Sequence, residues 1–203
     1  MKILQFILCG VLLTCFQYLY SQEDIALAEI KKFQAELNEE YSNSDTSPLE
    51  PDDLKKFKGH DFFDINLKFR VKAKLTHQEG SFFDMKTSSG KTKPYRVYGT
   101  IQFTLNEQSI TVPIYQSKDL MSNPEYTDYL FLPFTDLTSG ETSYGAGRYL
   151  GLRIPPTGDE VIVDFNQAYN PYCAYSKRFS CPIVPPENDI PVRIEAGVRL
   201  IAK

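Results

Sequence analysis

Histidine is scarce in this 203-residue chain and occurs only at His60 and His77. Serine and cysteine hydrolases need an imidazole base beside the nucleophile, and the sequence contains no GxSxG motif around a nucleophilic serine. Zinc is also disfavoured, because both histidines lie far from the cysteines and the cysteine spacing does not resemble a zinc knuckle. The sequence therefore predicts no metal and no cofactor, and it leaves open whether the protein is an enzyme.

Clusters of basic residues are missing as well. The chain has 22 lysine and arginine residues against 26 aspartate and glutamate residues, and its net charge is −4 at pH 7. Proteins that bind nucleic acid or an anionic membrane surface concentrate positive charge on one stretch or face. We therefore predict that neither is a partner, and the composition indicates no particular oligomeric state.

The sequence lacks an apolar run long enough for a membrane-spanning helix, which needs about 20 residues. Its apolar run near the N terminus, Ile3–Phe16, follows Lys2 and precedes a polar break, and this order is typical of a secretory signal peptide. We predict that residues 1–21 are removed and that the mature protein is exported, to a periplasmic or extracellular space, without stable membrane insertion. Anchoring as a lipoprotein through Cys15 is the alternative.

Only two of the four cysteines, Cys173 and Cys181, lie outside the predicted signal peptide. In an exported protein such a pair predicts a disulfide. The bond would close a short loop and stabilise the fold by roughly 2.5 kcal/mol. Metal binding and nucleophilic catalysis by these cysteines are the rival interpretations, and the shortage of histidine argues against both.

Residues 22–60 form a predicted N-terminal helical segment. Apolar residues recur there at spacings of three and four, which predicts a long amphipathic helix with one buried stripe. The stripe consists of Ala26, Ile30, Phe33, Leu37 and Tyr41. We expect this helix to pack on its own domain, and a partner-binding helix is the alternative. Farther on, Ser47 and Glu50 have the spacing of a capping box, with Pro48 at the first helical position. This pattern predicts a short second helix that ends near Gly59.

From residue 61 to residue 203 the hydrophobic period is two, as in strands with one buried and one exposed face. Turn residues separate the alternating stretches. The predicted strands cover residues 65–75, 83–87, 95–105, 110–114, 129–134, 148–154, 160–165 and 192–200. The chain is therefore predicted to be mainly β, with a single antiparallel domain of about eight strands that is either barrel-like or a sandwich. We favour a barrel-like sheet with the N-terminal helix packed against an opening or edge.

Two charged residues fall on the buried faces of predicted strands. Asp136 has the strand parity of the apolar Phe134, and Arg148 has the parity of the apolar Leu150. An acid and a guanidinium are thus expected to meet at the inner ends of the fifth and sixth strands. One interpretation is a structural ion pair that closes the end of the core. The other is an arginine that binds a carboxylate or phosphate, with Asp136 orienting it.

Two irregular segments adjoin these strands. Residues 135–149 are polar and glycine-rich, so backbone N–H groups are able to approach a ligand, although the spacing matches no nucleotide-binding motif. Residues 164–188 contain prolines that prevent regular structure, and a long ordered loop of this kind is usually functional. The candidate ligand-binding residues are Asp136, Tyr144, Arg148, Asp164, Asn166, Asn170, Glu187 and Asn188. Local turn formation is the alternative role for the aspartate and the asparagines.

Three stretches of these segments, TSGETSYGAGRYL, DFNQAYNPYCAYS and CPIVPPEN, resemble an uncharacterised prokaryotic family, the domain-of-unknown-function family sixteen-eighty-four. The likeness runs from Leu54 to the C terminus, and AYNPYCAYS is highly specific to the family. The resemblance implies no known activity, but it implies that the two segments belong to one pattern and share a site. Family members usually read AGE near the end, whereas this chain has Ala196-Gly197-Val198, so the acidic group that the family carries there is missing.

These features give three functional hypotheses. The first is an exported β-rich domain that binds a small polar or anionic ligand between residues 135–149 and 164–188, with Arg148 as anchor. The second is a hydrolase of envelope or extracellular material that uses carboxylates as acid and base. The third is a structural or interaction module without a ligand. An open cavity around the charged candidates would favour the first two, and pairing among them without a cavity would favour the third.

Overall fold

The computed structural model describes the backbone of residues 2–200 and the side chains of residues 22–200. The predicted signal peptide, residues 1–21, therefore lies outside the described side chains. Among the described helices, none combines the length and the apolar character needed to cross a membrane.

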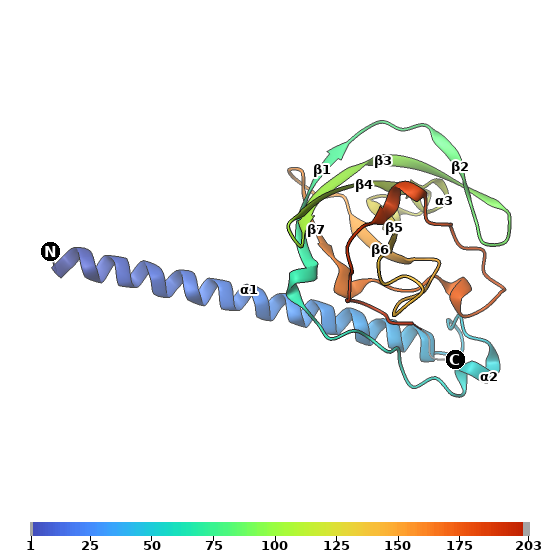
Figure 1. Cartoon of the computed structure of the whole chain (residues 1–203), viewed down its shortest axis with the longest axis horizontal. Coiled ribbons are helices and arrows are strands. Elements are labelled where there is room, and N and C mark those ends of the chain that lie inside the picture. The colour runs from blue at the N-terminus through green and yellow to red at the C-terminus, as the bar shows by residue number, and fades with distance from the viewer. Residues whose placement is uncertain (1, 201–203) are drawn as a thin grey trace.

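A single curved sheet dominates the fold (Figure 1). Its strands are β1 (Arg70–His77), β2 (Phe82–Lys86), β3 (Thr92–Leu105), β4 (Gln108–Ser117), β5 (Tyr129–Asp136), β6 (Arg148–Arg153), β7 (Glu160–Asp164) and β8 (Asp189–Ile190). The main path has the order β6-β5-β4-β3-β1-β7, while β2 pairs with β3 and β8 runs parallel to β5. The sheet curls until β6 and β7 lie beside each other without pairing, so the barrel is nearly closed. The prediction of a mainly β, barrel-like domain is confirmed.

Apolar residues fill both sides of part of this sheet. On β5, the side chains of Leu130, Leu132 and Phe134 point into the barrel and have no exposed surface. On its other face, Phe131 packs with Tyr149 in a second cluster, which residues of the 164–188 segment cover. Because β5 is buried on both faces, it reads as a continuous apolar run instead of an alternating one. The 164–188 segment is thus an outer layer on the sheet.

The C-terminal half of the N-terminal helix α1 (Lys2–Ser42) lies against one side of the barrel, and the helix's side chains are described from Gln22 onwards (Figure 1). Four residues of the predicted stripe, Ala26, Ile30, Leu37 and Tyr41, are buried. The Glu29 carboxylate accepts a hydrogen bond from Arg70 at the start of β1 (2.6 Å). The helix therefore packs on its own domain, as predicted.

Short helices connect the strands. The α-helical turns are α2 (Pro51–Leu54) and α3 (Lys118–Met121), and the 3₁₀ turns are η1 (Leu67–Phe69), η2 (Pro124–Tyr126), η3 (Phe165–Gln167), η4 (Tyr172–Ala174) and η5 (Pro186–Asn188). The first predicted strand, residues 65–75, begins late because Asn66 accepts a hydrogen bond from the Lys68 N–H (3.1 Å) and starts η1. Consequently β1 begins at Arg70.

The predicted capping box is wrong. The Ser47 hydroxyl donates to the Tyr41 carbonyl (2.7 Å) and accepts from the Leu49 N–H (3.2 Å), so Ser47 closes the end of α1. The second helix begins at Pro51, which takes the first helical position that we predicted for Pro48. It ends at Leu54, five residues before the predicted end at Gly59.

The last predicted strand, residues 192–200, is wrong as well. Its alternation is correct, because Val192, Ile194, Ala196 and Val198 are all buried. Its backbone forms no strand ladder, however, and the only isolated bridge found there among the described residues joins Val198 to Phe62. The carbonyl groups of this C-terminal segment instead accept hydrogen bonds from an arginine side chain, described next.

Candidate functional site

Asp136 at the end of β5 and Arg148 at the start of β6 meet inside the domain, as the strand parity predicts. Arg148 Nη2 lies 3.1 Å from Asp136 Oδ1, and neither side chain has exposed surface. The pair sits at the end of the barrel core, beside the ring of Phe134. Burial lowers the pKa of Arg148, and the charge of Asp136 opposes this effect.

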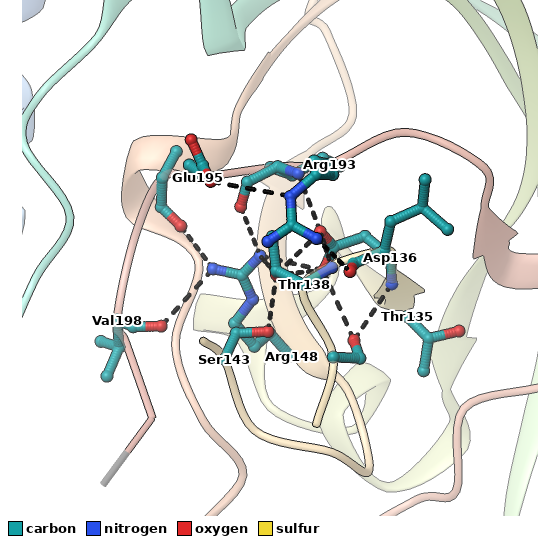
Figure 2. Close-up of polar contacts among 12 residues, drawn as sticks. Thr135, Asp136, Thr138, Ser143, Arg148, Arg193, Glu195 and Val198 are labelled. Carbon is teal, nitrogen blue, oxygen red and sulfur yellow. Dashed lines mark hydrogen bonds and ion pairs between the residues drawn. The ribbon is translucent and has the colours of Figure 1, made fainter. Parts of the chain in front are cut away.

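The C-terminal segment completes this pair (Figure 2). Arg148 Nη2 donates to the Ile194 carbonyl (2.8 Å), and Nη1 donates to the carbonyls of Ala196 and Val198. In return, the Ile194 N–H donates to Asp136 Oδ2 (2.8 Å). The two charged side chains thus make the hydrogen bonds that a neighbouring strand would otherwise make. A buried ion pair stabilises a fold only when such additional partners are present.

The 135–149 loop supplies further hydrogen-bond donors to the Asp136 carboxylate. Thr138 donates to Asp136 from its backbone N–H (3.1 Å) and from its hydroxyl (2.8 Å to Oδ2), and Ser139 donates its hydroxyl at 3.4 Å. The Thr138 hydroxyl also lies 2.8 Å from that of Ser143. These contacts use both oxygens of the carboxylate and both Nη atoms of Arg148 within the chain, so this network holds the loop and the C-terminal segment together.

Asp164 lies in a second network at the end of β7. Its Oδ2 accepts from Arg70 Nη1 (2.7 Å), and its Oδ1 accepts from the backbone and side-chain N–H groups of Asn166 (3.0 and 2.8 Å). Asn166 in turn exchanges hydrogen bonds with the backbone of Asn66 (2.9 and 3.1 Å). The contacts between Asp164 and Asn166 are those of an Asx turn, which was the alternative role for these residues.

The remaining candidates lie in other places. The Tyr115 hydroxyl donates to Asn188 Oδ1 (3.0 Å) and to Glu187 Oε1 (3.5 Å), so these two residues fasten η5 to β4. Asn170 Nδ2 donates to the Tyr175 hydroxyl (3.2 Å). Tyr144 is half-buried, and burial raises the pKa of its phenol. Seven of the eight candidates, all but Tyr144, therefore belong to several separate networks, and the eight do not surround one cavity.

Cys173 and Cys181 are close together but are not bonded in the structure. The backbone N–H of Cys173 points at the Cys181 sulfur (3.2 Å). Burial raises the pKa of the Cys181 thiol to about 11. Within residues 22–200, no cluster of three histidine, cysteine, aspartate or glutamate residues is arranged to hold a metal ion.

A pocket of about 580 Å³ lies beside α2 and the C-terminal segment. Its lining consists of Leu49, Asp53, Lys56, Phe57, Gly59, His60, Asp61, Ala174, Tyr175, Val198, Arg199 and Leu200. Three separate stretches of sequence contribute these residues, so no local motif predicts them. Among these residues, only His60 carries a chemical signal in the sequence, as an imidazole that could serve as a metal ligand or a catalytic base.

His60 is neutral in this pocket wall. Asn38 Oδ1 accepts a hydrogen bond from the His60 backbone N–H (2.8 Å), which identifies that atom as the amide oxygen. The same oxygen lies 2.9 Å from Nδ1, so Nδ1 carries the ring proton. Burial lowers the pKa of His60 to about 4. The ring packs edge-on against Tyr41, with 4.4 Å between the centroids.

Comparison with known proteins gives a family and a fold but no activity. A family model described as "Protein of unknown function (DUF1684)" matches residues 55–199. Among solved structures, the solution NMR structure of an uncharacterised protein of Haloarcula marismortui is similar, with a TM-score of 0.69 and 33% sequence identity. The match covers 88% of this chain and 96% of that chain. No curated protein matches.

The buried pair predicts a large and specific loss of stability on mutation. We expect Arg148→Met to lower the free energy of unfolding by about 3–5 kcal/mol, because it leaves the Asp136 carboxylate buried without its cation. Urea denaturation measures this loss. The control Arg153→Met breaks an exposed ion pair with Asp128 and is expected to cost about 1 kcal/mol or less. Equal losses in the two variants would show that the buried pair has no special role.

Proposed function

The chain belongs to the DUF1684 family of proteins of unknown function, and from this premise we propose that it is an exported protein that binds a small anionic ligand. The proposed site is the pocket between α2, the 164–188 segment and the C-terminal segment. Its volume of about 580 Å³ falls within the range of small-molecule sites, about 300–1,000 Å³.

The chemistry of the pocket supports a ligand with an apolar body and a negative group. Phe57, Tyr175 and Val198 contribute apolar or aromatic surface. Two basic residues, Lys56 and Arg199, and two acidic residues, Asp53 and Asp61, also line the pocket. Arg199 pairs with Asp61 (3.7 Å), whereas Lys56 forms no ion pair within the described part of the chain, so its ammonium group is available to a carboxylate or phosphate.

One observation carries the proposal. The two segments that carry the family pattern, residues 135–149 and 164–188, hold the pocket wall formed by residues 198–200. Arg148 donates to the Val198 carbonyl (3.4 Å), Asn170 donates to the Arg199 carbonyl (3.4 Å), and the Leu200 N–H donates to the Thr142 carbonyl (2.8 Å). The 135–149 loop and the 164–188 segment thus position a binding wall. In this proposal Arg148 does not contact the ligand, because its guanidinium has no exposed surface. It instead holds the pocket wall in place.

Hydrolysis by paired carboxylates is less well supported than binding. Asp136 already binds Arg148, and Asp164 already binds Arg70, so each carboxylate is engaged by a guanidinium within the chain. Neither aspartate is among the residues that line the proposed pocket. A module without a ligand is the remaining alternative, and the pairing of the charged candidates without a shared cavity favours it. The separate pocket beside α2 supports binding instead, and the ligand experiment below decides between the two.

Export and a disulfide between Cys173 and Cys181 are further parts of the proposal. The apolar N-terminal run supports export, and the proximity of the two cysteines supports an oxidised pair. The intact mass of the protein recovered from outside the cytoplasm is expected to match a chain beginning at Gln22 and lacking two thiol hydrogens. A mass that includes residues 1–21 would contradict cleavage, and two thiols open to alkylation would contradict the disulfide.

Thermal-shift screening against small carboxylates and phosphates tests the binding proposal. We expect at least one aromatic or alicyclic anion to raise Tm by several degrees, because a ligand at 100 times its Kd adds about 2.7 kcal/mol. Lys56→Gln is expected to weaken that ligand roughly fivefold or more. Lys55→Gln is the matched control, since Lys55 lies outside the pocket and pairs with Asp52. No hit in the panel, or equal effects of both variants, would reject the site.

A further inference from the structure

A groove separate from the pocket beside α2 lies between β6 and β7, where the barrel is not closed by strand pairing. β6 and β7 follow each other in sequence, yet they stand at opposite ends of the strand order and share no ladder. Along β6, a depression of about 620 Å³ and another of about 230 Å³ share the residues Leu150 to Arg153 and Gln167. We call this continuous feature the seam groove, and it has no lining residue in common with the pocket beside α2.

The outer edge of β6 has backbone groups available for pairing. Tyr149 exchanges both of its backbone hydrogen bonds with Tyr169 (2.9 and 3.0 Å), so its N–H and C=O point away from β5. In an antiparallel pair this direction recurs at every second residue. The N–H and C=O groups of Gly151 and Arg153 therefore also point into the seam groove, and within the described chain they have no backbone partner there. An edge of this kind is a template for another strand.

One face of α1 forms the opposite wall, together with Ile162 and Asp164 of β7 in the smaller depression. The helix contributes Glu29, Phe33, Glu36, Leu37 and Glu40. From Glu29 to Glu40 the wall is about 16 Å long at 1.5 Å per residue. An extended chain rises about 3.3 Å per residue, so about five residues fit along it. The floor between the helix and β6 contains Tyr169 and Tyr172.

The charges of the seam groove favour a basic occupant. The two arginines of the groove are already neutralised, Arg153 by Asp128 (2.7 Å) and Arg70 by Glu29 and Asp164 (2.6 and 2.7 Å). Two further carboxylates stand on the helix wall. Glu36 is exposed and has only a long contact with Lys32 (3.7 Å), and Glu40 accepts from the neutral Tyr172 hydroxyl. Both carboxylates remain available to an incoming cation.

We propose that the seam groove binds an extended, positively charged peptide segment of another protein, which adds as a short strand to the free edge of β6. Its backbone pairs with Gly151 and Arg153, and its lysine or arginine side chains, pointing the same way at alternate positions, reach Glu36 and Glu40. Peptides bound in this way gain affinity from the backbone and selectivity from the side chains. The acidic helix face thus selects basic sequences.

The experiment uses the full chain and a capped five-residue peptide of alternating valine and lysine, labelled for fluorescence anisotropy. We expect saturable binding that weakens with salt, and amide shifts at Gly151 and Arg153 in NMR spectra. The same peptide with glutamate in place of lysine is expected to bind at least about tenfold more weakly. Methylation of alternate backbone nitrogens is expected to abolish binding, since it removes the donors that pair with β6.

Two variants on α1 separate a specific site from general attraction to an acidic protein. Glu36→Lys is expected to weaken the lysine peptide roughly tenfold. Glu39→Lys changes the net charge equally on an exposed residue that does not line the groove, and it is expected to change binding less than about twofold. Absence of binding at millimolar peptide, undiminished binding of the methylated peptide, or equal effects of the two variants would each overturn the proposal.

Discussion

The buried pair of Asp136 and Arg148 is the interaction on which the arrangement of this fold depends. Removing two charges from water costs several kcal/mol per ion, and hydrogen bonds to both groups offset this cost. Arg148 Nε has no such partner within the described chain. Here the C-terminal segment supplies three carbonyl acceptors and one N–H donor, and the 135–149 loop supplies the remaining donors to the carboxylate. The charges therefore determine where two otherwise irregular segments lie.

This constraint explains how a segment without strand pairing covers the end of the barrel core. Ile194 and Ala196 place apolar side chains in the core, while their backbone groups bond to charged side chains instead of a neighbouring strand. Gly197 fits the same path: its φ is +75°, and an added Cβ would lie 2.5 Å from the Ala168 carbonyl oxygen. The next residues, 198–200, form one wall of the proposed pocket. The C-terminal segment therefore connects the apolar core, the Asp136–Arg148 network and the wall of the proposed pocket.

Much of this follows from sequence periodicity. The parity of Asp136 and Arg148 predicted their meeting, and the helical spacing of Ile30 and Leu37 predicted the packed helix. Alternation also predicted the buried face of residues 192–198, but it does not specify the hydrogen-bond partner of the backbone, so the strand there was wrong. The pocket was missed because three distant stretches form it, and periodicity carries no information about such long-range neighbours.

The amide of Ile194 tests the central claim most directly, because its only hydrogen-bond acceptor within the described chain is the Asp136 carboxylate. Native-state hydrogen exchange is expected to place this amide in the slowest class, which opens only with global unfolding. The neighbouring amides of Arg193 and Glu195, which have no such acceptor among the described residues, are expected to exchange much faster. Exchange of Ile194 at the same rate as these neighbours would contradict the account.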